Sequence, residues 1–486
     1  MAFNRKDISR RNFLKVGSLT LAASAIHPSS IFSSSIMEQV TYVSKRPPLE
    51  KRNFVSSAVE TTIEQTKRKI KDEKLKWMFE NCFPNTLDTT VKHSVKESRP
   101  DTFVITGDIE AMWLRDSSAQ VWPYLQLMNK DKELKSLIAG LINRQADCIQ
   151  IDPYANAFND GPIGSYWETD NTQKMSKELH ERKWEIDSLC YPIRLAYHYW
   201  KITGDASIFD SNWHKSMELV VKTFKEQQRK NDLGPYSFTR DCDRPTDSQI
   251  NDGWGAPVKP VGLIVSSFRP SDDATQYGFL IPSNMFAVVS LRQLAEIEKT
   301  VLNNQSFANE CSALAEEVDT AIKNYGIVCH PVCGQVYAFE VDGFGNALCM
   351  DDANIPSLLA APYLGYCSID DTTYLRTRDL IWSDNNPYFF KGKAGEGIGG
   401  PHVGLDYVWP MSIIMKGLTS NDPNEIQGCL KQLKNTDGDT GFMHESFHSD
   451  DASNFTRSWF AWVNTLFGEL ILKVSREHPQ LLFKTL

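Results

Sequence analysis

The sequence predicts an all-α fold, a toroid of about twelve helices, and three observations carry this prediction. Apolar residues recur at helical spacing along most of the 486 residues. Strand-like runs are few and short, as at 261–268 and 336–341. Several connections are long and rich in Gly, Pro, Asp, Asn and aromatic residues, and such loops are usually functional. A helical solenoid is the alternative, but no fixed-period repeat supports it.

The helices are expected in regular succession after a polar linker that ends near Pro48. Leu134, Leu137 and Leu141 mark the apolar stripe of one helix, and Leu466 with Leu470 marks the last. The predicted helices cover residues 59–82, 117–128, 131–150, 184–203, 209–230, 283–300, 306–324, 354–364, 370–381, 404–417, 422–435 and 454–475. The long connections cover residues 153–171, 241–276, 381–404 and 437–454. In a toroid, loops at one end would line a common site.

The first 35 residues are predicted to be an export signal and polar linker, ahead of a single domain at 45–486. Ser9 to Lys15 reads S-R-R-N-F-L-K, and a weakly apolar run follows, as in bacterial twin-arginine signals. A plain basic arm would not require that pattern. Ala23-Ser24-Ala25 is a candidate cleavage site. We therefore expect passage through the twin-arginine export machinery into the periplasm.

The charge balance excludes some classes of partner. The net charge is −9, with no dense run of Lys and Arg, so nucleic acid is not an expected partner. Residues 1–25 carry five basic groups and one acid, so removing them takes away +4 and leaves −13. No uninterrupted apolar run reaches about 18 residues, so no stable membrane span is expected after signal removal.

Ten cysteines are scattered through the chain without any Cys-x-x-Cys pair. A core of this size does not need disulfide staples. Most of the cysteines are therefore predicted to be packing residues, with one or two disulfides left open.

The first motif that could carry chemistry spans residues 106–120 and includes Trp113, Arg115 and Asp116. These residues supply an apolar platform, a fork of donors and an acceptor, which is what a sugar requires. Asp116 could also be the N-cap of a helix that begins at Ser117. Capping alone would not explain the neighbouring Trp and Arg.

The second motif is the loop at 267–274, where Asp272 and Asp273 follow Arg269. An arginine can hold one carboxylate ionised while its surroundings keep another protonated, which suits acid/base catalysis. An Asp-rich turn or a helix cap is the competing interpretation, and for this loop in isolation it is the favoured one.

The third motif, His444-Glu445-x-x-His448, matches the zinc-protease pattern, with Glu469 as a conceivable third ligand. Zinc binding needs both histidines on one helical face. Gly441 precedes the motif and a turn-forming Ser-Asp-Asp-Ala-Ser-Asn run follows it, so a helix is disfavoured. Glu445 is therefore interpreted as a loop carboxylate, and no metal is expected.

A Gly-rich segment at 395–400 satisfies G-x-G-x-x-G, the pattern of dinucleotide sites. Such a site needs a buried strand before the glycines and a helix after them, whereas Pro401 follows at once. The segment is predicted to be a flexible loop over a site, with His402 presented from its far end.

Taken together, R-P-D-T-F-V-I-T-G-D-I-E-A-M-W-L-R-D-S, F-R-P-S-D-D-A, L-I-P-S-N-M-F-A, H-E-S-F-H and F-T-R-S-W-F-A-W resemble glycoside hydrolase family 125, the metal-independent exo-α-1,6-mannosidases. The resemblance runs from about residue 45 to the C-terminus. It implies an (α/α)6 barrel and an inverting mechanism without a cofactor. It also implies that Asp272 or Asp273 is the general acid and Glu445 the general base.

The resemblance further implies which residues bind the sugar. Arg115 and Asp116 match a segment expected to grip the terminal mannose. The candidates for the wall of the site are Trp113, Arg269, His444, Arg457 and Trp459. His402, at the end of the Gly-rich loop, is a further substrate-binding candidate on its position and not on the resemblance. The expected substrate is a glycan with terminal α-1,6-linked mannose, as in N-glycans and mannan. The alternatives are another toroid glycosidase acting on glucosides or uronides, a zinc peptidase, and a non-catalytic mannoside-binding protein.

Overall fold

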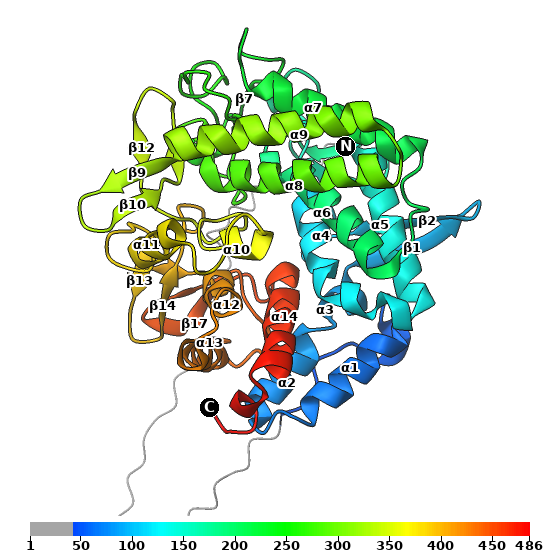
Figure 1. The fold of residues 1–486 in the computed structure, drawn as a ribbon. Helices are drawn as coiled ribbons and strands as arrows, with labels where there is room; N and C mark the ends of the chain where they lie inside the picture. Colours follow the sequence, from blue (N-terminus) through cyan, green and yellow to red (C-terminus); the bar gives the residue numbers. More distant parts are fainter. Residues whose placement is uncertain (1–41) are drawn as a thin grey trace, which may run out of the picture. The chain divides into compact units, whose positions relative to one another are not determined.

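Six helices form an inner ring in the structure, a computed structural model that describes residues 42–486. They are α4 (Leu114–Val121), α6 (Ile186–Thr203), α8 (Ile281–Thr300), α10 (Ala361–Leu364), α12 (Pro410–Leu418) and α14 (Ala461–Glu477). Contacts run in succession from α4 to α6, from α6 to α8 and from α8 to α10, and α14 contacts both α12 and α4. The last helix thus closes the ring against the first (Figure 1). Every residue of α4 is buried, as expected of a helix enclosed on all sides.

The remaining helices pack around this ring. They are α1 (Ser57–Lys67), α2 (Glu73–Cys82), α3 (Asn85–Thr89), α5 (Lys132–Ile151), α7 (Ser211–Gln227), α9 (Gln305–Ala321), α11 (Thr372–Ile381) and α13 (Pro423–Asn435). Helix α9 packs on α8, and α13 packs on α12 and α2. Helix α13 buries one narrow stripe, Ile426, Cys429, Leu430 and Leu433, which is typical of an outer helix. The predicted all-α (α/α)6 toroid is therefore confirmed.

The connections between the helices contain short antiparallel strands, and these strands are more numerous than the sequence predicts. The hairpins are β1 (Val91–Lys96) with β2 (Arg99–Val104), β9 (Ile327–His330) with β10 (Gly334–Tyr337), and β13 (Phe389–Lys391) with β14 (Glu396–Ile398); β5 (Asn171–Thr172) pairs with β7 (Phe238–Thr239). The three-stranded sheets are β3 (Met112–Trp113), β4 (Ala157–Phe158) and β6 (Leu179–Glu181); β8 (Phe279–Leu280), β11 (Glu340–Val341) and β12 (Ala347–Leu348); and β15 (Tyr407–Val408), β16 (Ser446–His448) and β17 (Asp451–Thr456).

Some predicted boundaries are wrong, for local reasons. The segment 59–82 divides into α1 and α2, and only 361–364 of 354–364 is helical. The last helix begins at Ala461, because 451–456 forms β17. The strand expected at 261–268 reduces to a single bridge between Phe268 and Ala274. Helix α4 begins at Leu114, so Asp116 lies in its first turn and is not an N-cap.

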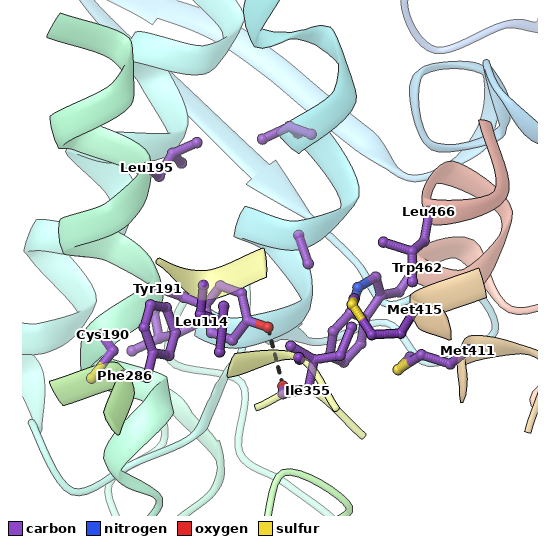
Figure 2. Close-up of a cluster of buried hydrophobic side chains, with 14 of the residues drawn as sticks. Leu114, Cys190, Tyr191, Leu195, Phe286, Ile355, Met411, Met415, Trp462 and Leu466 are labelled. Atoms are coloured by element: carbon purple, nitrogen blue, oxygen red, sulfur yellow. Dashed lines mark hydrogen bonds between the residues drawn. The ribbon is translucent and has the colours of Figure 1, made fainter. Parts of the chain in front are cut away.

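The centre of the ring is filled with side chains. Leu114, Tyr191, Phe286, Met411 and Trp462 come from five different inner helices and lie together (Figure 2). The Tyr191 hydroxyl donates to the Ile355 carbonyl at 3.1 Å across this cluster. The ring is therefore packed through its middle, and the polar residues described below lie at the N-terminal ends of its helices.

Residues 42–486 form one compact unit. None of the helices in this part of the chain is long and apolar enough to cross a membrane. All ten cysteines lie within it and all are unpaired, so the disulfides left open by the sequence do not form here. Five of these cysteines are buried, whereas Cys242 and Cys329 are exposed and are not packing residues. The predicted export signal at 1–35 lies outside the described residues.

Candidate active site

The candidate catalytic residues cluster where the inner helices begin. Arg115 and Asp116 lie in the first turn of α4, Glu185 precedes α6, and Glu445 and Arg457 lie in the connection that leads into α14. Among the described helices, none of the six inner ones has a side-chain N-cap. Seven of the others are capped by Ser, Asp or Asn. The uncapped helix starts concentrate N–H dipoles at this end of the ring, which favours carboxylates there.

A tight turn separates the two adjacent aspartates. The Arg269 amide donates to the Asp273 carbonyl at 2.8 Å, and the Asp272 amide donates to the Arg269 carbonyl at 2.9 Å. Asp272 sits in the left-handed region at φ 67°, which costs free energy for a residue other than glycine and often marks a functional position. The side chain of Asp272 is 25% exposed, whereas that of Asp273 is fully buried. Only Asp272 is therefore accessible to a substrate.

Arg115 lies at the centre of a buried acidic cluster. Its Nη1 donates to Glu185 Oε2 at 2.5 Å and to Asp187 Oδ2 at 3.4 Å, and its Nη2 donates to Asp272 Oδ1 at 3.3 Å. Its Nε lies 3.4 Å from Asp116 Oδ2. One guanidinium thus faces four carboxyl groups, and one positive charge cannot balance four ionised carboxylates in a dry environment.

The pKa values in this cluster diverge accordingly. Burial raises the pKa of Glu185 well above its usual value, and the charges of Asp272 and Asp187 raise it further against the opposing Arg115. Burial also raises the pKa of Asp187 to about 6, and it raises the pKa of Asp116. Burial would raise the pKa of Asp272 as well, but the charges of Arg115 and Lys183 and a hydrogen bond from Glu185 lower it. Neighbouring carboxyl groups whose pKa values are shifted in opposite directions are characteristic of acid/base sites.

Glu445 is held from two sides. The neighbouring Met443 amide donates to Asn464 Oδ1 at 2.8 Å, which ties the segment to α14. Arg457 Nη1 donates to Glu445 Oε1 at 3.5 Å, and the same guanidinium binds Asp108. Arg457 follows β17 with a left-handed φ of 47°, so this turn directs its side chain back towards Glu445.

His402 connects the two candidate catalytic carboxylates electrostatically. Its Nδ1 lies 3.6 Å from Asp273 Oδ1, and neither atom has a hydrogen-bond partner among the described residues. Burial lowers the pKa of His402, but Asp273 and the charges of Glu445 and Asp272 outweigh this effect and raise it. His402 therefore lies within the electrostatic reach of both Asp272 and Glu445.

The aromatic candidates differ in exposure. Trp113 is 7% exposed, its Nε1 has no partner among the described residues, and its ring stands edge-on to His180 at 5.3 Å. Trp459 is half-buried, and a Cβ added to Gly107 would lie 3.2 Å from its ring. Trp113 thus combines an apolar face with an unpaired donor in the site, whereas Trp459 rests against the backbone of the 106–111 loop.

Two sequence-predicted wall residues are buried beneath the site. Arg269 Nε donates to Glu340 Oε1 at 2.6 Å, which fixes the base of the 267–274 turn. His444 stacks on Phe455 at 3.7 Å, and its two ring nitrogens lie against the carbonyls of Arg457 and Asp437. Both residues support the loops that carry Asp272 and Glu445 and do not line an open surface.

The zinc-protease pattern does not form a helical ligand pair. His444 precedes β16, and His448 is its last residue. Glu469 lies in α14 and accepts hydrogen bonds from Trp122 and Tyr363. The two histidines therefore do not lie on one helical face, which the zinc interpretation requires.

Sequence reasoning missed several members of the cluster. Glu185, Asp187, Asn156, Lys183 and Asp352 are all buried within it or directly beneath it. Asn156 Nδ2 lies 3.4 Å from both Glu185 Oε1 and Asp272 Oδ1. One local signal could have pointed to them: two carboxyl residues, Glu185 and Asp187, lie at the start of a predicted helix. Acidic residues are common at that place because they interact favourably with the helix dipole, so the pair did not stand out as a functional site.

The arrangement is suited to hydrolysing a glycosidic bond. It offers an exposed carboxyl on a charged cluster, a second carboxylate on a separate loop, and paired donors and acceptors for hydroxyl groups.

The Gly-rich segment 395–400 packs against the site: β14 covers 396–398, and a Cβ added to Gly400 would lie 3.0 Å from Asp352. The segment therefore is not a dinucleotide loop.

Comparisons with known proteins agree with this chemistry. The family described as metal-independent α-mannosidase (GH125) matches residues 72–472. The meiotically up-regulated gene 157 protein of Schizosaccharomyces pombe is 43% identical over 458 residues, 90% of each chain. A metal-independent α-mannosidase of Streptococcus pneumoniae, solved in a non-productive complex with α-1,6-mannobiose, is 45% identical with a TM-score of 0.83 and covers 86% of this chain and 99% of its own.

A more distant solved structure shares the fold alone. A bacterial glucoamylase complexed with acarbose aligns with a TM-score of 0.56 at 12% identity, over 88% of this chain and 58% of its own. The helical ring, the clustered carboxyls and the family match lead to one conclusion: this chain belongs to glycoside hydrolase family 125 and is a metal-independent α-mannosidase.

Proposed function

We propose that this enzyme removes non-reducing terminal α-1,6-linked mannose from N-glycan or mannan-type oligosaccharides, with inversion at the anomeric carbon. The linkage is supported by the Streptococcus pneumoniae relative, which was solved with α-1,6-mannobiose in work on N-linked glycan processing. At 45% identity over nearly the whole of that chain, a shared substrate class is the simplest expectation.

Asp272 acts as the general acid and Glu445 as the general base in this proposal. The observation that carries the acid assignment is the exposure difference within one turn, 25% for Asp272 against none for Asp273. Asp272 protonates the glycosidic oxygen as the bond from C1 to that oxygen breaks. Glu445 takes a proton from the water that bonds to C1 from the opposite face. An inverting enzyme needs about 6.5–9.5 Å between the two carboxyls to admit this water.

Arg115, Asp116 and Trp113 hold the terminal mannose. Asp116 Oδ2, which faces Arg115 Nε at 3.4 Å, and Trp113 Nε1 are buried polar atoms without a hydrogen-bond partner among the described residues. A sugar hydroxyl can donate to the first and accept from the second, while the Trp113 ring packs against a C–H face of the sugar.

The decisive experiment follows the anomeric proton by NMR during the first turnovers of α-1,6-mannobiose. β-Mannose should appear first, and initial release of α-mannose would overturn the inverting assignment. Glu445→Gln and Asp272→Asn should each lower kcat by about 10²–10⁴-fold while mannoside binding is retained. Glu64→Gln, on the exposed face of α1, is the matched control and should leave kcat unchanged. Full activity of Glu445→Gln would refute the base assignment.

Export by the twin-arginine route into the periplasm is also proposed. It is supported by the S-R-R-N-F-L-K segment at 9–15 and fits the ten unpaired thiols, because twin-arginine substrates cross the membrane already folded. A double Arg10→Lys, Arg11→Lys variant should leave the precursor inside the cell, whereas Lys6→Arg should export normally. Normal export of the double variant would exclude this route.

A further inference from the structure

Two carboxyl groups in the site share the same pair of hydrogen-bond donors. Arg115 donates through Nη1 to Glu185 Oε2 at 2.5 Å and through Nη2 to Asp272 Oδ1 at 3.3 Å. Asn156 Nδ2 lies 3.4 Å from both Glu185 Oε1 and Asp272 Oδ1. Two donors that each bridge the same two carboxyls hold those carboxyls side by side.

The two members of the pair have different environments. The Glu185 side chain is fully buried, and its Oε2 also accepts from the Ser188 hydroxyl at 3.0 Å. Its Oε1 accepts from Asn156 Nδ2 at 3.4 Å, and the carboxyl of Glu185 is hydrogen-bonded to that of Asp272. Asp272 is partly exposed, and Lys183 Nζ donates to its backbone carbonyl at 2.8 Å. A proton on Glu185 Oε1 is thus shielded from water yet adjacent to a carboxylate that is not.

We propose that Glu185 holds the catalytic proton in the resting enzyme and passes it to Asp272, so that the two carboxyls share one proton. This inference rests on the proposed function, in which Asp272 is the general acid. It makes Glu185 a positioning residue, because it acts through Asp272 and does not touch the substrate. The opposite pKa directions of the two groups, raised for Glu185 and lowered for Asp272, agree with the geometry.

The transfer balances without any added reagent. The O–H bond of Glu185 breaks as an O–H bond forms on Asp272, and Glu185 becomes a carboxylate paired with Arg115. Asp272 then gives this proton to the glycosidic oxygen as the bond from C1 to that oxygen breaks. Afterwards both carboxyls are ionised, and the exposed Asp272 takes up one proton from solvent and returns it to Glu185, which restores the resting state. This matches the proton that Glu445 releases to solvent from the attacking water.

Other charged groups face the pair and set its titration. Asp187 and Asp116 lie against Arg115, and both favour retention of a proton by the cluster. Lys183 and His402 bring positive charge near Asp272, and Asp247 accepts from Lys183 at 3.1 Å. His180 lies within the field of Asp272. Because the positive charges of Lys183 and His402 act on Asp272, and the negative charge of Asp187 acts on Glu185, the resting proton is kept on Glu185.

The test compares two substrates in Glu185→Gln. The amide oxygen of the introduced glutamine can still accept from Arg115, but the side chain holds no transferable proton. On α-1,6-mannobiose kcat should fall about 10–100-fold, with the alkaline limb of the pH profile shifted to lower pH. On α-mannosyl fluoride, whose leaving group needs no protonation, kcat should change less than about threefold. Asp187→Asn, the matched control beside Arg115, should affect both substrates alike. An equal loss on both substrates in Glu185→Gln would overturn the proposal.

Infrared difference spectroscopy separates this proposal from the proposed function, because it needs no turnover. In the difference spectrum between the unmodified enzyme and Glu185→Gln at neutral pH, one carbonyl stretch of a protonated carboxylic acid should appear. Other protonated carboxyls, such as Asp351, whose pKa burial raises to about 8, contribute equally to both proteins and cancel. Absence of this band from the difference spectrum would refute a protonated Glu185, even in an active mannosidase. Absence of mannobiose cleavage with the band present would instead refute the proposed substrate. If Glu185→Gln fails to fold, Asn156→Ala keeps both carboxyls and should shift the band frequency, and an unshifted band would count against the pair.

Discussion

At the scale of single residues, one backbone angle places two adjacent aspartates in different environments. The left-handed φ of 67° at Asp272 sends its side chain to Arg115 and the solvent, while Asp273 turns inward beneath His402. Such a conformation costs about 1–3 kcal/mol, which the surrounding hydrogen bonds of the turn must offset. Sequence motifs carry no signal for this angle, so the order Asp-Asp alone did not show which of the two side chains is exposed.

The His402–Asp273 contact predicts a pH-dependent contribution to stability. The pKa of His402 is raised in the fold, so its contribution is fully present below about pH 6.5 and is lost as the pH rises through the folded value. The pKa of Asp273 is lowered, so its contribution fades only in acid, as the pH falls through its folded value. Asp273 is fully buried and His402 is partly exposed, so the pair should contribute on the order of 1 kcal/mol.

The measurement is urea unfolding of the unmodified enzyme and His402→Gln at pH 5.5 and 8.5, values chosen to bracket the usual histidine pKa of about 6.5. The difference in unfolding free energy between the two proteins should be larger at the lower pH. A difference that grows towards alkaline pH would contradict the assignment.

At the scale of elements, two helical glycines should respond oppositely to alanine. A Cβ on Gly468 of α14 would lie 2.6 Å from the Phe83 ring and 3.1 Å from its Cα, so the inner helix would be pushed from the outer layer. Gly468→Ala should cost about 1–3 kcal/mol. A Cβ on Gly428 of α13 would meet nothing within 4 Å, so Gly428→Ala should stabilise by about 0.5–1 kcal/mol. Denaturant midpoints test both, and a stabilised Gly468→Ala would refute the close contact.

The segment around Glu445 predicts that chelators leave activity intact. Residues 446–448 form β16, and both ring nitrogens of His444 are occupied by backbone carbonyls. Overnight dialysis against a strong chelator should change the mannosidase rate by less than about twofold. Removing a catalytic metal from an enzyme that uses one would cause a much larger loss. Loss of activity that zinc restores would contradict this expectation.

Element types were largely predictable, but their ends were not. Long helices such as α5 and α8 lie within two residues of their predicted bounds, because amphipathic periodicity is a local property. The two-residue strands escaped prediction, because a run that short has no readable period. The sequence predicts a helix over residues 454–460, but 454–456 belong to β17 and 457–460 connect it to α14. Strand pairing in the folded protein overrides a weak local preference for helix.

At the scale of the whole molecule, the large core makes disulfide staples unnecessary. All ten cysteines are unpaired in the described part of the chain. Thiol titration in denaturant should therefore find ten thiols per chain without prior reduction, and reduction should add none. Each bridge formed during export would lower that number by two. Protein purified from inside the cell is the control, since its thiols are kept reduced.

The sequence by itself determined the helical class, the order of elements and the candidate carboxyls Asp272, Asp273 and Glu445, because periodicity and motif chemistry reside in neighbouring residues. Only the tertiary structure decided that Asp272 faces the site, that Arg269 and His444 lie beneath it, and that Glu185 and Asp272 meet at Arg115. Arg115 and Asp272 are 157 positions apart, and the ring brings them to 3.3 Å. When the ring closes, the uncapped helix starts and the buried charged residues come together at one end. Their proximity depends on contacts between distant segments, so no local sequence pattern predicts it.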